Sequence, residues 1–169
     1  MAELLATRVQ NVSRAVYVLI AVLVSVGDQS TKRLVQRSIP FGSVIPVIPH
    51  FFNLTHSQNS GAAFGLFSES SSPWKTALLI LLSVILLSTV IGIAWRSHRL
   101  QWESGVGLSL IVGGAFSNLF DRIRFGVVVD FLDFYYRSYH WFTFNLADSA
   151  IVVGAGFLIL QVLFAGEHR

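Results

Sequence analysis

A run of 19 residues, 77–95, contains no charged side chain and lies between Lys75 on one side and Arg96 on the other. As a helix it is long enough to cross the hydrocarbon core of a bilayer, which takes about 20 apolar residues. Trp74 precedes the run, and aromatic and basic flanks are typical of the membrane interface. The sequence therefore predicts a transmembrane helix over about 74–95.

Three further apolar blocks occupy about 15–35, 104–122 and 144–165. The chain is 53% hydrophobic and only 12% charged, whereas about 25% of residues are charged in typical soluble proteins. Lipid offers no hydrogen-bond partner to bare backbone, and none of the blocks alternates in polarity, so all four are predicted to be helices. We expect one integral membrane domain, 1–169, of the all-α class, with four transmembrane helices and both termini on one side. Glycines that suit close helix packing lie in the third block, at Gly105, Gly107, Gly113 and Gly114.

The first block has an uninterrupted apolar part, 15–27, that covers only about 20 Å as a helix. To cross the membrane it must carry Asp28 and Lys32 to the membrane boundary. Basic residues followed by this run loosely fit a secretory signal peptide, but cleavage after Gly27 would destroy the first span. An uncleaved first helix is therefore favoured.

Two segments outside the blocks are predicted to lie at the membrane surface on the same side. The stretch 39–64 has the β-branched and aromatic residues of short strands, which Pro46 and Pro49 confine to edges or bends. The segment 124–141 is rich in aromatic residues and is expected as a loop at headgroup depth. Basic residues number five on the side of the termini and seven on the other, which would place the termini outside. Several of the seven neighbour acids or motif positions, so the orientation stays open.

Cysteine is absent, which excludes disulfides, thiolate chemistry and cysteine-bound metals. The net charge of +3 is modest, and the basic residues are scattered around the apolar blocks, so nucleic acid is not an expected partner. No GxSxG motif is present. His50 and His56 are interpreted as exposed loop histidines, because no third metal ligand clusters with them. We expect neither a metal nor another cofactor.

Asp130 and Asp148 lie in or beside strongly apolar sequence, VVVDFLDF and FNLADSAIVVGAGF. A buried carboxylate is costly unless it is paired, protonated or functional. Two carboxylates that approach closely share a proton, so one acts as a base and the other as an acid. Such a pair can activate water against a peptide carbonyl and protonate the leaving amine without a metal or a nucleophilic side chain. A hairpin before the fourth helix would bring these two residues together.

Each polar residue also has a plain structural interpretation. Asp148 suits the N-terminus of a helix, and Asp130 has Asp133 as a rival three residues later. Asp121 next to Arg122 predicts a local ion pair or a helix end. Lys32 follows Asp28 by four residues, so these two suit an ion pair on one helix face. Amides that suit turns or caps are Asn59, Asn118 and Asn145.

Five motifs, taken in order, resemble those of the bacterial lipoprotein signal peptidases (signal peptidase II), a family of membrane aspartyl peptidases. They are DQSTK at 28–32, NSGAAF at 59–64, GGAFSNLFDR at 113–122, VVDF at 128–131 and FNLAD at 144–148. Each motif alone is weak, but their joint order on a chain of this length is specific. One departure is Ser117, where the family commonly has Gly before the Asn.

The resemblance implies a catalytic pair, Asp130 and Asp148, that cleaves signal peptides from diacylglyceryl-modified prolipoproteins on the N-terminal side of the lipidated cysteine. It implies a small extracytoplasmic β-sheet, a loop or short helix over the site at about 64–73, and no cofactor. It places the protein in the bacterial plasma membrane with cytoplasmic termini and the site near the outer face. The expected partners are the lipidated precursor and membrane lipid, with the enzyme a monomer. Supporting or substrate-binding positions are Asp28, Lys32, Asn59, Gly61, Asn118, Arg122 and Asn145.

Two other classes of function stay open at this point. A small proton-coupled transporter would use Asp28 and Asp148 as proton carriers, although the two halves of the chain show no convincing internal similarity. A structural membrane subunit would use its acids only to pair with arginines.

Overall fold

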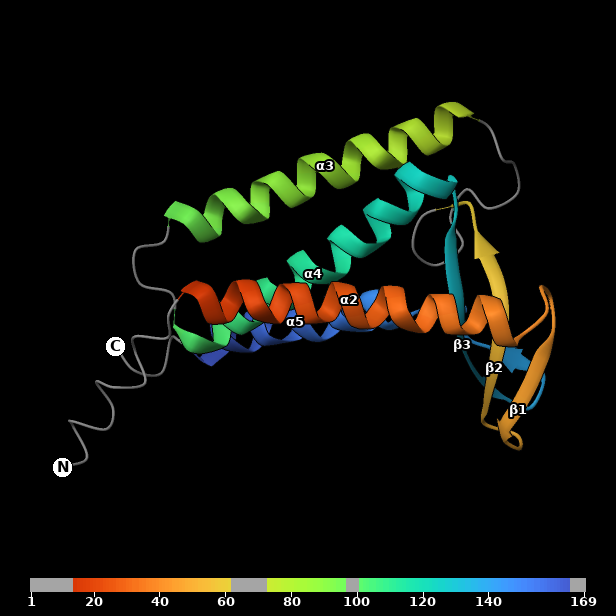
Figure 1. Cartoon of the computed structure of the whole chain (residues 1–169). Coiled ribbons are helices and arrows are strands. Elements are labelled where there is room, and N and C mark those ends of the chain that lie inside the picture. The colour runs from red at the N-terminus through yellow and green to blue at the C-terminus, as the bar shows by residue number, and fades with distance from the viewer. Residues whose placement is uncertain (1–13, 62–72, 97–100, 165–169) are drawn as a thin grey trace.

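The computed structural model describes residues 14–61, 73–96 and 101–164. Within this part of the chain, four helices are long and apolar enough to cross a membrane. Figure 1 shows them as a bundle with a small β-sheet at one end. The predicted class, a bundle of membrane helices with an antiparallel sheet, is confirmed. The helices are α2 (Arg14–Ser38), α3 (Pro73–Arg96), α4 (Trp102–Phe125) and α5 (Leu146–Phe164).

The helix ends follow local sequence. Pro40 lies shortly after the end of α2, and a proline disfavours helical geometry at the residue before it. Gly126 ends α4 with φ 74°, and its N–H donates to the carbonyl oxygen of Arg122. This left-handed cap is one that glycine adopts without a steric penalty. The chain therefore turns out of the bundle directly after α4 and enters the sheet.

The central helix α4 packs against α2, α3 and α5. Its glycines allow close approaches to α2 and α5. A Cβ placed on Gly114 would lie 2.4 Å from the carbonyl oxygen of Ala147 in α5, and one on Gly113 would lie 2.6 Å from that of Ala21 in α2. Both distances are far below any real Cβ contact, so side chains at these positions would force the helices apart. The predicted role of these glycines in close packing is confirmed.

The sheet is antiparallel, with strand order β1-β2-β3-β4. Its strands are β1 (Val44–Ile48), β2 (Phe52–Asn59), β3 (Val128–Tyr136) and β4 (Tyr139–His140). The expectation that the segment 124–141 is a loop is wrong, because most of it forms β3 and β4. Its first residues, Val128 to Phe131, are at most 5% exposed. A strand buried on both faces lacks the alternation that marks a half-exposed strand.

Two irregularities in the sheet bear on the site. Pro46 lies in the edge strand β1, where the register shifts before Ile48, as predicted for a proline in a strand. Between β2 and β3 the register shifts from Leu54 opposite Leu132 to Ser57 opposite Asp130. One such bulge changes the direction in which the following side chains point.

The segment before α5 is attached to the sheet. Phe144 exchanges backbone hydrogen bonds with Leu132 of β3, and its carbonyl oxygen also accepts from Phe131. Asn145 and the first turn of α5 are therefore held beside Asp130. This is the hairpin expected from the sequence. The loop predicted over the site at about 64–73 lies outside the described residues, except for Pro73, which begins α3.

Candidate active site

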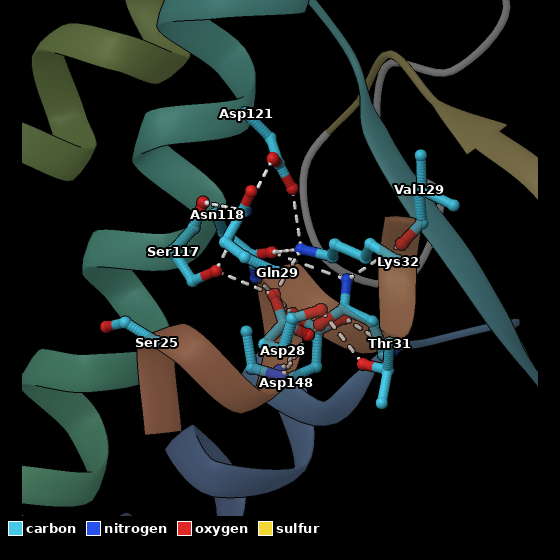
Figure 2. Close-up of polar contacts among 12 residues, drawn as sticks. Ser25, Asp28, Gln29, Thr31, Lys32, Ser117, Asn118, Asp121, Val129 and Asp148 are labelled. Carbon is cyan, nitrogen blue, oxygen red and sulfur yellow. Dashed lines mark hydrogen bonds and ion pairs between the residues drawn. The ribbon is translucent and has the colours of Figure 1, made fainter. Parts of the chain in front are cut away.

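A group of buried polar side chains meets where the bundle joins the sheet, and Figure 2 labels five of its members, Asp28, Lys32, Ser117, Asn118 and Asp121. Lys32 of α2 lies at the centre of one part. Its ammonium group is 2.6 Å from a carboxylate oxygen of Asp28 and 2.6 Å from one of Asp121. The ammonium group also donates to the side-chain amide oxygen of Asn118 at 2.8 Å. All three ammonium hydrogens thus have partners, and this cation stabilises two buried carboxylates.

Asp28 connects three helices and is fully buried. One carboxylate oxygen accepts from the backbone N–H of Ala147, in the first turn of α5, at 2.9 Å. The other accepts from Lys32 and from the Ser117 hydroxyl at 2.7 Å. The ion pair with Lys32 predicted from their spacing is confirmed. A carboxylate at a helix N-terminus interacts favourably with the helix dipole, so Asp28 fixes where α5 begins.

Asp148 is held by a reciprocal pair of bonds at the same helix end. The Asn145 side-chain oxygen accepts from the backbone N–H of Asp148 at 3.0 Å. A carboxylate oxygen of Asp148 accepts from the Asn145 backbone N–H at 3.3 Å. This is the geometry of a capping box. The other carboxylate oxygen accepts from the Asn118 amide at 2.8 Å. The cap predicted for Asp148 is confirmed, and this cap also fixes its carboxylate in the site.

Asp130 projects from β3 and is 1% exposed. Its two oxygens accept from the side-chain amides of Asn145 at 2.7 Å and Asn59 at 3.0 Å. Burial, followed by the nearby negative charge of Asp148, raises the pKa of Asp130 to about 7, although the two amides and Lys32 oppose the shift. Because Asn145 contacts both Asp130 and Asp148, one residue brings the two predicted acids to a common point.

A further chain of contacts leads from Asp130 toward α4. The backbone N–H of Gly61 donates to the side-chain oxygen of Asn59 at 2.8 Å. The Arg122 guanidinium donates to the carbonyl oxygen of Gly61 at 3.2 Å. The structure therefore gathers all nine residues singled out as catalytic or binding positions at one end of the bundle.

The local ion pair predicted between Asp121 and Arg122 is wrong, as is a helix end at these residues. Helix α4 continues to Phe125, and adjacent residues on a helix point in different directions. Asp121 instead faces α2, where it accepts from Lys32 and, at 2.7 Å, from the Gln29 amide. Gln29 was not identified from the sequence. Gln29 follows Ser25 by four residues and precedes Lys32 by three, so these three residues share one helix face. This spacing is the sequence signal that identifies Gln29 as a candidate.

Asp133, the rival of Asp130, belongs to a separate cluster. It accepts from the Asn53 amide at 2.8 Å and contacts His140 at 2.9 Å. The interpretation of His50 as exposed is confirmed, but that of His56 is wrong, since it lies in β2 and is 7% exposed. Its ring nitrogen Nδ1 donates to the carbonyl oxygen of Ile39 at 2.8 Å. Across the described ranges, no group of three or more His, Cys, Asp or Glu residues is placed to hold a metal ion.

Comparison with known proteins agrees with this geometry. Residues 20–164 match the profile of a family described as signal peptidase (SPase) II. The chain belongs to the signal peptidase II family. A lipoprotein signal peptidase of Solibacter usitatus is 46% identical over 144 residues, covering 85% of this chain and 88% of the relative. One from Desulforapulum autotrophicum is 41% identical over 146 residues, covering 86% and 90%.

Solved structures extend the likeness to three dimensions. A bacterial membrane enzyme solved at 2.3 Å resolution superposes with a TM-score of 0.79 at 33% identity, covering 88% of each chain. A second, solved at 1.9 Å, gives a TM-score of 0.75 at 32% identity, covering 89% of this chain and 94% of the other. This member of the signal peptidase II family is thus a multi-pass membrane protein with the same fold as solved membrane enzymes.

Proposed function

We propose that this protein is an aspartic endopeptidase that removes signal peptides from diacylglyceryl-modified prolipoproteins, cutting on the N-terminal side of the lipidated cysteine. The observation that carries the proposal is the pair Asp130 and Asp148, two largely buried carboxylates both hydrogen-bonded to Asn145. Neither forms a salt bridge to a cation within residues 14–61, 73–96 and 101–164. Two acids held only by N–H donors are suited to share one proton.

The division of roles follows from the surroundings. Asp130, with its pKa raised to about 7, carries the proton below that pH, polarises the peptide carbonyl by hydrogen bonding through this proton, and then donates the same proton to the leaving amine. Asp148 acts as the base that takes a proton from the attacking water. Each of its oxygens has one protein donor, from Asn118 or Asn145, and a second lone pair for water. Covalent attack by a side chain is not needed.

The substrate class is supported by relatives named lipoprotein signal peptidases. A signal peptide is itself an apolar helix, and two acyl chains on its cysteine would anchor the cleavage point at interface depth. We place the site near the outer face of the bacterial plasma membrane, with cytoplasmic termini and a monomeric enzyme. Asn59, Gly61 and Arg122 lie beside Asp130 and are the candidate contacts for substrate carbonyls or the lipid headgroup.

The transporter alternative relied on Asp28 as a proton carrier. Asp28 is fully buried and bonded to Lys32, Ser117 and the first turn of α5. These bonds give Asp28 a structural role in joining three helices, so the peptidase is favoured.

Incubation of the purified protein with a synthetic lipidated signal peptide tests the proposal, with mass spectrometry of the products. We expect one cut before the lipidated cysteine, no cut in the unlipidated peptide, and full activity with a chelator present. Asp148→Asn removes the base and is expected to be inactive while keeping the unfolding temperature of the wild type. Cleavage that needs a metal ion, or that persists in Asp148→Asn, would contradict an aspartic mechanism.

A further inference from the structure

A groove lies between α2, α3 and α4 at the end of the bundle away from the sheet. Its volume is about 540 Å³. Apolar side chains from all three helices line most of it, among them Val18, Val22, Ala94, Leu108 and Val112. A Cβ on Gly105 would lie 2.2 Å from the Tyr17 ring, so Tyr17 packs directly onto the α4 backbone and forms one wall.

The groove is separate from the candidate active site along the membrane normal. On α2 its lining runs from Arg14 to Val26 and stops before Asp28. On α4 the lining runs from Gly105 to Phe116 and stops before Ser117. The stretch from Arg14 to Val26 rises about 18 Å along a helix, close to half the thickness of a bilayer. The groove thus occupies the leaflet opposite the two candidate catalytic acids.

The open end of the groove carries a cation at headgroup depth. The Arg14 guanidinium lies 5.5 Å from the centroid of the Trp95 ring. Trp95 is 73% exposed and Trp102 is 44% exposed, as expected for aromatic residues at a membrane interface. In the part of the chain that the structure describes, Arg14 forms no salt bridge to a carboxylate.

Two apolar occupants are considered for this groove, a signal-peptide helix and a phospholipid acyl chain, and the charge beside each apolar part decides between them. A signal-peptide helix begins with a basic segment, which would meet Arg14 with the same sign of charge. In an anionic phospholipid an apolar chain is followed by a phosphate. In this site the apolar groove is likewise followed by the cation of Arg14. Arginine binds phosphate with charge-assisted hydrogen bonds. We propose that the groove holds one acyl chain of an anionic phospholipid of this leaflet, with its phosphate on Arg14.

The proposal is tested on the full chain in mild detergent by native mass spectrometry with phosphatidylglycerol and phosphatidylcholine. Wild type is expected to retain phosphatidylglycerol more strongly. Arg14→Gln should lose this preference by on the order of tenfold, whereas Arg14→Lys keeps most of it. Ala94→Phe fills the groove and should lower retention of both lipids. The matched control is Arg96→Gln, which removes an exposed charge from the end of α3 outside the groove lining and should behave as wild type.

A second measurement locates the chain. With Trp74, Trp102 and Trp141 replaced by phenylalanine, brominated phosphatidylglycerol should quench Trp95 more than brominated phosphatidylcholine, and Arg14→Gln should abolish the difference. Equal lipid preference in wild type and Arg14→Gln would overturn the proposal, as would an equal loss in Arg96→Gln. Removal of residues 1–13 is expected to leave retention unchanged; a rise would show that this segment fills the groove instead.

Discussion

Two pairs of aspartates, of which Asp28, Asp121 and Asp130 are buried and Asp148 is partly buried, lie close together in this protein and differ in their partners. Asp28 and Asp121 both contact the Lys32 ammonium group at 2.6 Å. Asp130 and Asp148 accept hydrogen bonds from asparagine side chains and backbone, and neither forms a salt bridge within the described ranges. A cation fixes the charge of a carboxylate, whereas amide donors hold its position and leave it able to take up a proton.

The comparison separates the aspartates that hold the helices in position from those proposed to transfer protons. The first pair attaches α2 to α4 and, through the bond from Asp28 to the backbone of Ala147, to the start of α5. The second pair lies where the first turn of α5 meets β3, and Asn145 contacts both of its carboxylates. Catalytic acids must be positioned to within a fraction of an ångström, and residues behind them supply that rigidity. We propose that the ion-paired aspartates hold together the helices that carry the other two.

The largest expected effect comes from the same substitution made in both pairs. Asp130→Asn and Asp148→Asn should each lower kcat by about 10³-fold or more, since each removes a proton-transfer group, while thermal unfolding in detergent changes little. Asp121→Asn should retain most activity and instead lower stability, by about 1–3 kcal/mol. Equal losses of activity at Asp121 and Asp148 would remove the distinction between the pairs.

Removal of the shared cation should give the largest effect on stability. Lys32→Met leaves two buried carboxylates without a partner and is expected to cost about 3–5 kcal/mol. Arg37→Met is the control on the same helix, because Arg37 is exposed and should change stability by less than about 0.5 kcal/mol. The measurement is unfolding in detergent. A second variant, Lys32→Met with Asp121→Asn, should recover part of the loss; no recovery would contradict an electrostatic origin.

The pH dependence tests the second pair alone. The fold raises the pKa of Asp130 from 3.8 to about 7, so its proton is held below that pH and leaves above it. The kcat of cleavage should therefore fall as the pH rises through about 7. The amide of Asn59 opposes the shift, so Asn59→Ala should move this fall to higher pH. A fall in the same place in both proteins would show that another group titrates.

The smallest expected effect lies at Ser117, the departure from the family pattern. Its hydroxyl donates to Asp28 and accepts from Gln29 at 3.1 Å, and the residue is 1% exposed. Ser117→Ala should lower the free energy of unfolding by about 1 kcal/mol and leave kcat within a few-fold. An effect on kcat as large as that of Asp148→Asn would place Ser117 in the chemistry.

Helix existence and the grouping of the polar motifs were predictable, because long apolar runs and acids within them are strong signals. Strand β3 was not, because Val128 to Phe131 are buried on both faces and show no alternation. The partner of Asp121 was also missed. Which side chain a helical acid faces depends on the neighbouring helix, and only the packing of α2 on α4 brings Lys32 and Gln29 to it.

The most direct test of the account is the number of protons on the second pair. Infrared difference spectra between wild type and Asp130→Asn, recorded in the region of the carboxylic acid carbonyl stretch, report that proton. At pH 6 we expect one protonated carboxyl in the wild type that is absent from the variant and that disappears as the pH rises through about 7. Identical spectra at pH 6, with both Asp130 and Asp148 ionised, would contradict a shared proton.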